Sequence, residues 1–492
     1  MPGALTHDPI RVGGGLHQNA DGSVATDADG RPNALSVLQI ASVLASAPQR
    51  YSIGIAVFGD SHSNNAVYTD GTSPDGLSVP AWFVDGATNN NWRAWGWPAW
   101  VGPLSMQRAR VVKSWARQTN GLLYAGTTPV GVPLSVQVTQ AMADPLWAQV
   151  DRAAICIGFN DIAFTIAECV AELLKQIRRM GKPVDLITSP PRSDAPNTAT
   201  QGDGMQGWAW MATWRNALRY IADASGGWVR WIDGYGAIVT PTTTPPVYAA
   251  SRSSDTIHPN SGGAYLIADA YVQSLFPSGI GGDLDIWPTA SYASTSGANS
   301  VIDQGFANPT FATASGGTGT GTIAGSLTVT NSGATHSGSV GACTIPGGVG
   351  NMQTLAITAS AAGDYVNVAG ATVHAAGGTF LAAGDKCFAQ CLLRVNSGGI
   401  YPRNMRLINI GTQGGTNYFS TLFEIDATKE VALPLTATRT LLLRTPVITM
   451  PSGAAFSSLP PALRLTFAAA GSCTVDISNF EVRRIRSGGV YA

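Results

Sequence analysis

IGIAVFGDSH, residues 53–62, sets the architecture of the first half of the chain. The apolar run at 53–58 is short and rich in β-branched residues, so it predicts a buried strand. This strand leads directly into Gly59, Asp60 and Ser61. In a parallel α/β sheet, ligands bind beside the carboxyl ends of the strands. The stretch therefore predicts that the Ser61 hydroxyl lies at a binding or catalytic site.

Two later segments add polar groups of complementary chemistry. A second apolar run, at 153–157, ends in Gly158-Phe159-Asn160-Asp161, and far downstream Asp255 and His258 stand three positions apart. A serine hydroxyl needs a neighbouring base, the base needs an orienting acid, and a developing oxyanion needs hydrogen-bond donors. Serine, histidine, aspartate and asparagine together form a full set for acyl transfer.

These segments resemble three sequence blocks of the SGNH hydrolase superfamily, also called GDSL-like esterases. The matching positions, in the order of the family's blocks, are Gly59, Asp60 and Ser61, then Gly158, Asn160 and Asp161, then Asp255 and His258. The resemblance covers about residues 50–277. It implies a flavodoxin-like, three-layer α/β sandwich with a parallel sheet, and a serine esterase that needs no cofactor and no metal.

The resemblance also implies a role for each matching residue. Ser61 would attack an ester carbonyl, His258 would act as base and then as acid, and Asp255 would orient the imidazole. The oxyanion would be held by the backbone N–H of Ser61, the side-chain amide of Asn160 and the N–H of a block-two glycine.

That block-two glycine is either Gly131 or Gly126. Both follow residues 122–125, which we expect to form the second strand. Gly131 is favoured because a helical segment follows it from about Pro133. Either glycine could instead only permit a turn with positive φ.

Each candidate has a structural interpretation as well. Ser61 could be a helix N-cap, Asn160 and Asp161 could form a turn before a helix, and Asp255 and His258 could belong to a surface loop. Asp60 is expected to bond nearby backbone groups. His62 receives no role in the triad, and it either contacts substrate or packs.

Expected strands and helices alternate along this half of the chain. The strands are expected at 53–58, 122–125, 153–157, 184–188 and 228–232, and the helices at 104–118, 162–180, 207–224 and 261–275. Alternation of this kind predicts a mostly parallel sheet covered on both faces. Residues 1–50 form a leader with a helix expected at 32–45, and residues 51–277 form the hydrolase domain.

An insertion at 64–102 is rich in tryptophan. Polar residues surround its indoles, which favours a loop over a core helix or strand. Trp92, Trp95 and Trp97 are therefore candidate substrate-binding residues, because indole faces pack well on sugar rings. The alternative is a satellite apolar cluster that pins a long loop.

After residue 277 the pattern changes. Residues 278–306 resemble a linker, and 307–492 contain short β-rich runs separated by Gly, Ser and Asn. Such runs, at 325–330, 352–358, 388–395, 438–445 and 462–467, predict an antiparallel β-sandwich. Its two ends loosely resemble jelly-roll carbohydrate-binding modules. Sugar binding and a role in assembly both remain open.

Composition limits the partners. With a net charge of −1 and 12% charged residues in 492, nucleic acid and anionic membranes are not expected partners. No apolar run is long enough for a membrane span, and residues 1–30 do not read as a signal peptide. The six cysteines form no Cys-x-x-Cys pair, so free and mostly buried thiols are expected, without a metal site.

Together these features predict a serine esterase that removes O-acetyl or other short acyl groups from a polysaccharide, such as a bacterial surface glycan. In texture and architecture the chain resembles phage tail or tail-spike proteins, which would place it on a virion tail. The main alternative is a secreted bacterial carbohydrate esterase whose signal has been removed, which would act outside the cell. The sequence does not give the oligomeric state; a homo-oligomer is one option, and it would be a trimer if the protein belongs to a virion. Two alternatives are a lipase or thioesterase of the same fold, and an inactive structural or receptor-binding protein of a virion.

Overall fold

The computed structural model describes residues 52–63, 91–94, 96–117, 119–126, 131–191, 198–240, 243, 245–253, 255–280, 302–304, 308, 310–370, 386–413, 416–423, 431–445, 447–449 and 461–485. The expected leader at 1–50, with its helix, lies outside the described residues. Two compact units divide the chain, and the second begins at Ser52.

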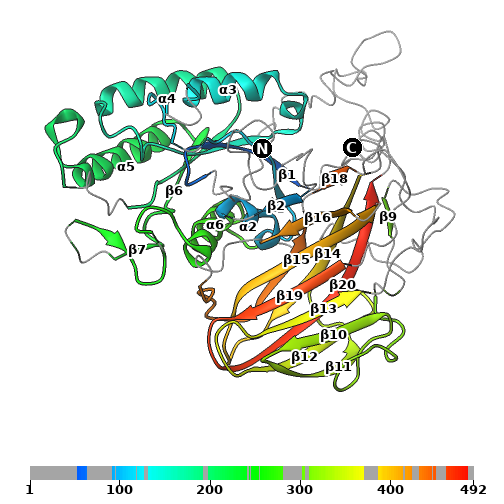
Figure 1. The fold of residues 1–492 in the computed structure, drawn as a ribbon. Helices are drawn as coiled ribbons and strands as arrows, with labels where there is room; N and C mark the ends of the chain where they lie inside the picture. The colour runs from blue at the N-terminus through cyan, green and yellow to red at the C-terminus, as the bar shows by residue number, and fades with distance from the viewer. Residues whose placement is uncertain are drawn as a thin grey trace, which may run out of the picture. The chain divides into compact units, whose positions relative to one another are not determined.

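A five-stranded parallel sheet organises the first half of the described chain (Figure 1). Each strand pairs in parallel with its neighbour. In spatial order the strands are β3 (Ala109–Ser114), β1 (Ile53–Gly59), β4 (Arg152–Cys156), β5 (Val184–Ile187) and β6 (Val229–Ile232). The sequence prediction of a parallel α/β sheet is confirmed, and β1, β4, β5 and β6 match four of the expected strands.

The second strand is the exception. Residues 109–114 form edge strand β3, although a helix was expected at 104–118, and 122–125 form no strand. Val111 and Val112 are β-branched, which disfavours a helix, and pairing with β1 supplies the backbone partners of a strand. Because one face of an edge strand can remain polar, the mixed composition of 109–114 resembled an amphipathic helix.

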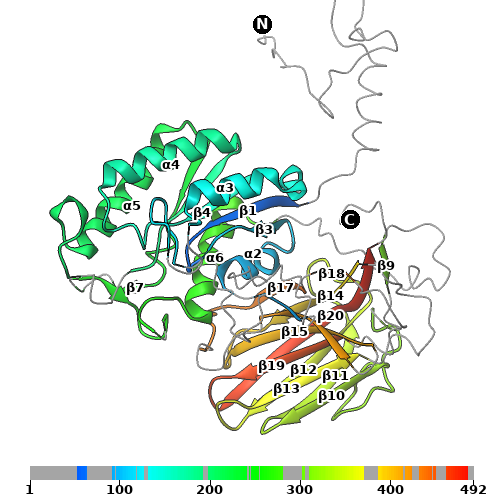
Figure 2. The ribbon, with the colours of Figure 1, turned by 45° about the horizontal axis from the view of Figure 1, so that its top comes forward.

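Helices cover both faces of the sheet, as expected of a three-layer fold. On β1, Ile55 and Val57 pack in one core cluster, and Ala56 and Phe58 pack in the other. The first cluster includes α2 (Trp97–Leu104) and α6 (Ser261–Leu275), and the second includes α3 (Leu134–Ala143), α4 (Ile166–Met180) and α5 (Gly207–Ala224). Figure 2 shows α3, α4 and α5 together on one side of the strands.

Helix α4 begins later than the expected 162. Thr165 and Glu168 form a reciprocal capping box, in which the Thr165 side chain accepts the Glu168 N–H and the Glu168 carboxylate accepts the Thr165 N–H. Residues 162–164 therefore belong to the turn that follows β4. Helices α5 and α6 match their expected ranges. Among the described residues, no helix has the length and apolarity that a membrane crossing requires.

The short elements of this half lie in its connections. They are the 3-10 helices η1 (Pro145–Gln149) and η3 (Gly202–Gly204), and the two-stranded ribbon of β7 (Val239–Thr240) and β8 (Val247–Tyr248).

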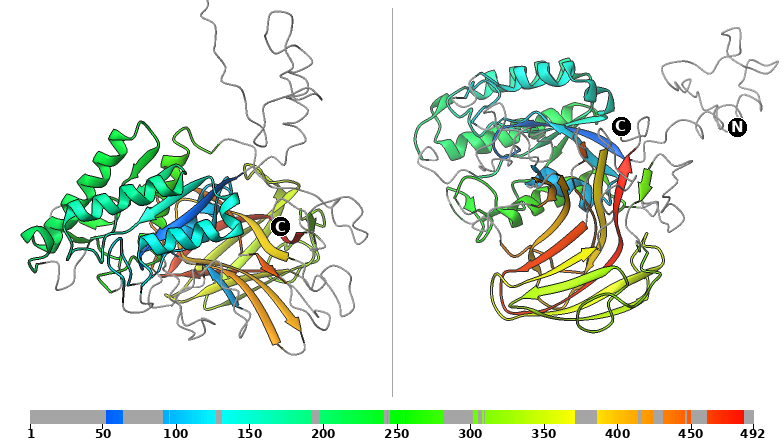
Figure 3. Two further views of the ribbon diagram at one scale, coloured as in Figure 1. Left: turned by 90° about the horizontal axis from the view of Figure 1, so that it is seen from above. Right: turned by 45° about the vertical axis from the view of Figure 1, so that its right-hand side comes forward.

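Two further sheets form a β-sandwich (Figure 3). The first contains β10 (Leu327–Ser332), β13 (Tyr365–Gly370), β19 (Pro461–Phe467), β15 (Pro402–Gln413), β16 (Thr416–Leu422) and β2 (Asn91–Ala94). The second contains β11 (Thr335–Ala342), β12 (Asn351–Ala359), β20 (Gly471–Ile485), β14 (Lys386–Val395) and β17 (Arg439–Arg444), with β9 (Ile302–Gln304) and β18 (Ile448–Thr449) attached. Buried residues of both sheets share one apolar cluster, so the expected sandwich is confirmed. Its jelly-roll identity remains a prediction.

Helix α2 joins the sandwich to the α/β part of the same compact unit. All eight of its residues are buried. Trp100 stacks on Phe423, just after β16, with ring centroids 3.9 Å apart, and meets Tyr265 of α6 edge-on at 5.1 Å. Strand β2 pairs in parallel with β16. The described part of the tryptophan-rich insertion thus contains a core helix and a strand, contrary to the expected loop.

Replacing Trp100 with alanine should therefore destabilise the protein strongly. Loss of a buried indole typically costs about 3–5 kcal/mol. Trp228 is 47% exposed, and Trp228→Ala is the matched control, expected to change the free energy of unfolding by about 0.5 kcal/mol or less. Urea unfolding followed by circular dichroism measures both. Equal shifts of the two variants would contradict the packing described here.

Candidate active site

The turn after β1 holds Ser61 in a tightly constrained position. Gly59 has φ +148°, and a Cβ there would lie 2.1 Å from the carbonyl oxygen of Cys156 on β4, so only glycine fits. The side-chain amide of Gln137, on α3, accepts the Gly59 N–H and donates to its C=O, both at 3.0 Å. The backbone that leads to Ser61 is therefore fixed from two sides.

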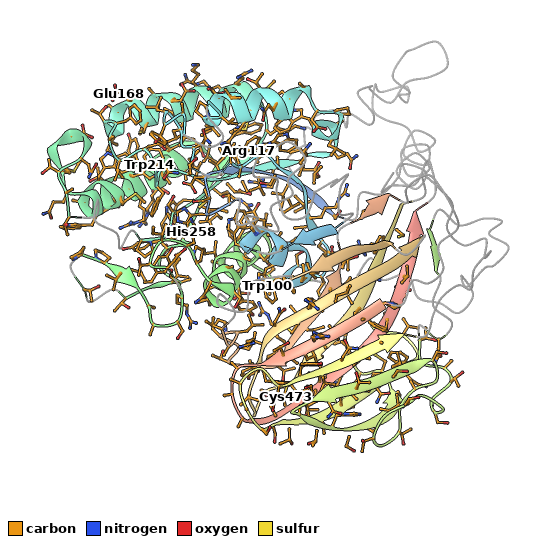
Figure 4. All side chains as sticks on the ribbon, in the orientation of Figure 1. Trp100, Arg117, Glu168, Trp214, His258 and Cys473 are labelled. Atoms are coloured by element: carbon orange, nitrogen blue, oxygen red, sulfur yellow. The ribbon has the colours of Figure 1, made fainter. Side chains whose placement is uncertain are left out.

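The structure brings Ser61, His258 and Asp255 together in one hydrogen-bonded chain. His258 Nε2 lies 2.9 Å from Ser61 Oγ, and His258 Nδ1 lies 2.8 Å from Asp255 Oδ2. Because the carboxylate accepts at Nδ1, that nitrogen carries the hydrogen in the neutral ring, and Nε2 is left to accept from the serine hydroxyl. Figure 4 labels His258 near the start of α6.

Asp255 remains ionised in this arrangement. Partial burial would raise the pKa of its carboxyl, but the hydrogen bond from the His258 side chain and the backbone N–H groups of His258 and Ile257 outweigh it. The pKa of Asp255 is therefore held well below its usual value. Its Oδ1 accepts those two N–H groups at 2.6 and 2.9 Å, which also orients the carboxylate.

The loop that carries Asp255 and His258 is tied to α6. Asn260 caps this helix by accepting the Gly263 N–H, and the Ser253 hydroxyl donates to the His258 carbonyl at 2.6 Å. Between the two functional residues, Thr256 has φ +65°, a conformation that β-branched residues rarely adopt. Strain of this kind persists only where the surroundings fix the backbone, and it is common at functional sites.

Asn160 follows β4, the strand beside β1. The preceding Gly158 has φ +117°, and a Cβ there would lie 2.3 Å from Nε1 of Trp214, which Figure 4 labels on α5. The Asn160 amide donates to the Asn120 carbonyl at 2.9 Å. Since an amide nitrogen carries two hydrogens, this bond orients Asn160 and leaves it a second donor.

Asp161 has a structural task that the sequence did not indicate. Its buried carboxylate accepts the backbone N–H groups of Leu122, Leu123 and Tyr124 at 2.8–3.0 Å. Burial raises the pKa of Asp161 to about 6, although these three bonds act in the opposite direction. The segment that was expected to be a strand is thus held as a loop by one side chain.

The two candidate glycines differ in their hydrogen bonds and in the packing around them. The Gly131 N–H donates to the Ala125 carbonyl at 2.5 Å, which occupies the donor that the expected role requires. Gly126 has φ +59°, and a Cβ there would lie 2.7 Å from the Asn120 side chain. The occupied N–H argues against Gly131 and favours Gly126, and the identity of the block-two glycine stays a prediction.

The tryptophan expectation is wrong for Trp97. Its side chain is completely buried and packs edge-on against Tyr271 at 5.6 Å, so it cannot reach a substrate. Trp92 lies on β2, where only the backbone is described, and Trp95 lies outside the described residues. For these two, substrate contact remains a prediction.

Gln137 is the other residue that the sequence did not indicate. It is a fully buried amide on a helix face shared with Leu134, Val138 and Ala141. A polar residue at a position that an apolar stripe assigns to the core is a signal that could have identified it, because buried amides need partners.

All six cysteines are free thiols and five of them are buried, as expected. In the part of the chain that the structure describes, no group of three or more His, Cys, Asp or Glu residues is arranged to hold a metal ion.

Comparison with known proteins gives neighbours among solved structures. A catalytic mutant of an acetylxylan esterase from Geobacillus stearothermophilus has a TM-score of 0.30 and 16% identity, covering 45% of this chain and 94% of its own. A carbohydrate acetylesterase from Sinorhizobium meliloti has a TM-score of 0.31 and 14% identity, covering 46% of this chain and 100% of its own. An inhibitor-bound aryl esterase of M. smegmatis has a TM-score of 0.30 and 15% identity, covering 46% of this chain and 99% of its own.

No protein-family model matches the chain, and no curated protein matches it. TM-scores this low do not establish a common fold, so the architecture rests on the strand order and helix placement given above.

The role of Asp161 predicts a local effect. In Asp161→Asn one acceptor oxygen becomes an amide that faces backbone N–H groups, so Leu122, Leu123 and Tyr124 should exchange their amide hydrogens faster. The free energy of unfolding should fall by about 1–3 kcal/mol, the usual cost of unsatisfied buried groups. Hydrogen exchange measured by mass spectrometry checks this.

The matched control is Asp144→Asn, at a carboxylate that accepts the N–H of Leu146. It should accelerate exchange at the start of η1 only. Unchanged protection of residues 122–124 in Asp161→Asn would show that the carboxylate does not hold the loop.

Proposed function

We propose that this protein is a serine esterase in which Ser61, His258 and Asp255 act as the catalytic triad. The observation that carries the proposal is the unbroken hydrogen-bond chain from Ser61 Oγ through both ring nitrogens to Asp255. Two of these residues lie on one tight loop and the third lies some two hundred positions earlier. A nucleophile, a base and an orienting acid in mutual contact are the arrangement that acyl transfer requires.

In the acylation step, Ser61 Oγ bonds to the acyl carbon while its proton passes to His258 Nε2. Asp255, which is already ionised, stabilises the imidazolium that forms. The tetrahedral intermediate then expels the alcohol, which takes the proton from Nε2, and an acyl-serine remains. Water repeats the sequence, so that the acid is released and Ser61 is restored.

The oxyanion would accept hydrogen bonds from the Ser61 N–H, the Gly126 N–H and the second N–H of Asn160. The contacts of Asp161 and Asn160 with the loop at 120–124 support this assignment, because they fix the backbone just before Gly126. Donors fixed in advance lower the barrier, since no reorganisation is needed as charge develops.

For the substrate we propose O-acetyl or other short acyl esters of a polysaccharide, such as a bacterial surface glycan. The His258 and Asp255 side chains are 31% and 38% exposed, so the triad lies open at the surface. An open site admits a small acyl group while the bulk of a polymer remains outside. The sandwich would then bind glycan or serve assembly, on a virion tail or outside the cell.

Replacing the nucleophile tests the reaction. Ser61→Ala should lower turnover of an aryl acetate by about 10⁴-fold or more, as expected when a triad nucleophile is removed. Ser63→Ala is the matched control, because Ser63 lies two residues away and donates to the Cys156 carbonyl instead. Its turnover should stay close to that of the wild type. Equal rates for Ser61→Ala and wild type would refute the esterase and leave an inactive structural protein as the alternative.

Acyl chain length tests the substrate class. We expect aryl acetate to be hydrolysed with a higher kcat/KM than aryl octanoate, and acetate to be released from O-acetylated bacterial polysaccharide in a Ser61-dependent way. A strong preference for octanoate would favour a lipase or thioesterase of the same fold and overturn the deacetylase proposal.

A further inference from the structure

A second aspartate–histidine pair lies beside the proposed triad. Asp60 Oδ1 accepts a hydrogen bond from the backbone N–H of His62, with the nitrogen 3.0 Å away. The same oxygen lies 2.8 Å from Nδ1 of the His62 ring and is hydrogen-bonded to it. Both side chains are completely buried. On the other side of the ring, Nε2 lies 2.9 Å from the carbonyl oxygen of Ile257. One imidazole thus links the loop after β1 to the loop before α6.

The two ends of this link flank the reacting groups in the sequence. Asp60 and His62 are the immediate neighbours of Ser61, and Ile257 is the immediate neighbour of His258. The rings of His62 and His258 lie 5.4 Å apart between centroids. A change in the link therefore moves Ser61 and His258 relative to each other.

Both groups that contact the ring nitrogens of His62 are hydrogen-bond acceptors. A carbonyl oxygen only accepts, and a carboxylate accepts, so both contacts are complete when both ring nitrogens carry hydrogen. The second oxygen of Asp60 is buried and has no hydrogen-bond partner among the described residues, so the hydrogen bonds of this carboxylate are those to His62. Such a pair is stable in the interior only while both partners are present.

Other groups complete the surroundings of the link. The Tyr248 hydroxyl donates to the same Ile257 carbonyl at 2.6 Å, and the ring of Phe159 packs on His62 at 4.5 Å. The Ile257 carbonyl is therefore held by two donors from different elements. This is a built contact rather than a chance approach of two loops.

We propose that His62 is a positioning residue that sets the distance between the nucleophile and the base by holding the Ile257 carbonyl. The proposal rests on the proposed esterase function. The triad hydrogen bond spans 2.9 Å, and a misplacement of about 1 Å can cost about 100-fold in rate. The link through His62 thus accounts for why two loops so distant in sequence keep a reactive spacing.

The test compares two amide replacements of the imidazole. The glutamine amide nitrogen can occupy the place of Nε2 and still donate to Ile257, whereas the asparagine amide nitrogen can occupy the place of Nδ1 and still donate to Asp60. His62→Asn should lower kcat for an aryl acetate by about 100-fold, with KM changed little, because the link to the base is lost. His62→Gln should keep kcat within about tenfold of the wild type.

Two further measurements separate positioning from general destabilisation. His336→Gln in the sandwich is the matched control, because His336 is also buried and also bonds through both ring nitrogens. It should leave kcat unchanged even if the melting temperature falls. The rate at which a fluorophosphonate modifies Ser61 should fall in parallel with kcat in His62→Asn and stay constant in His336→Gln.

Three results would overturn the inference. The first is a folded His62→Asn variant with the kcat of the wild type. The second is an equal loss of kcat in His62→Asn and His62→Gln. The third is a reduced kcat in His62→Asn while the rate at which the fluorophosphonate modifies Ser61 is unchanged. Should the His62 variants fail to fold, Tyr248→Phe removes the other donor to Ile257, and a loss of about three- to tenfold in kcat is expected from a weakened hydrogen bond. An unchanged kcat in Tyr248→Phe would also overturn it.

The inference and the proposed function fail in different ways. Wild-type turnover in Ser61→Ala defeats the esterase function itself. An inactive Ser61→Ala together with a fully active His62→Asn defeats only the positioning role.

Discussion

The close approach of Gly59 to the Cys156 carbonyl is the constraint on which the site depends. Strands β1 and β4 end side by side there, in register at Gly59 and Cys156. A side chain at residue 59 would push the two strand ends apart, and with them the turn that carries Ser61 and the turn that carries Asn160. The parallel sheet thereby places a hydroxyl and an amide at one edge before any loop is considered.

Buried polar side chains then complete what the sheet begins. Gln137, Asp161 and His62 each bind backbone groups of a loop distant in sequence, and none of them is one of the three proposed triad residues. Each supplies a hydrogen bond to backbone donors or acceptors that lie in the interior, where such groups need partners. The same bonds that meet this requirement also fix the loops, so stability and the geometry of the site have a common source.

Much of this arrangement could be predicted from the sequence, because apolar runs that end in polar residues have few interpretations in an α/β chain. Strands β1, β4, β5 and β6 and the positions of Ser61, Asp255 and His258 follow from such runs and motifs. Strand β3 could not be distinguished from a helix, because its assignment depends on pairing with β1 rather than on its own pattern. The prediction that Trp97 binds substrate was wrong for a related reason. A dense group of tryptophans has the same sequence pattern whether its side chains face solvent or pack on a core residue such as Tyr271. The choice between Gly126 and Gly131 depended on a hydrogen bond to Ala125, which spacing alone does not reveal.

The burial of α2 has a consequence for how far the sandwich and the α/β part can be separated. Its residues contact both α6 and β17, and the Gln107 side chain just beyond it donates to the Leu442 carbonyl. The Ser261 hydroxyl, three residues after His258, accepts the N–H of Val431, which precedes β17. A fragment that contains either part alone would expose these surfaces to water, and exposure of buried apolar surface lowers the stability of a fold. Each part therefore depends on the other for the burial of its side of this joint.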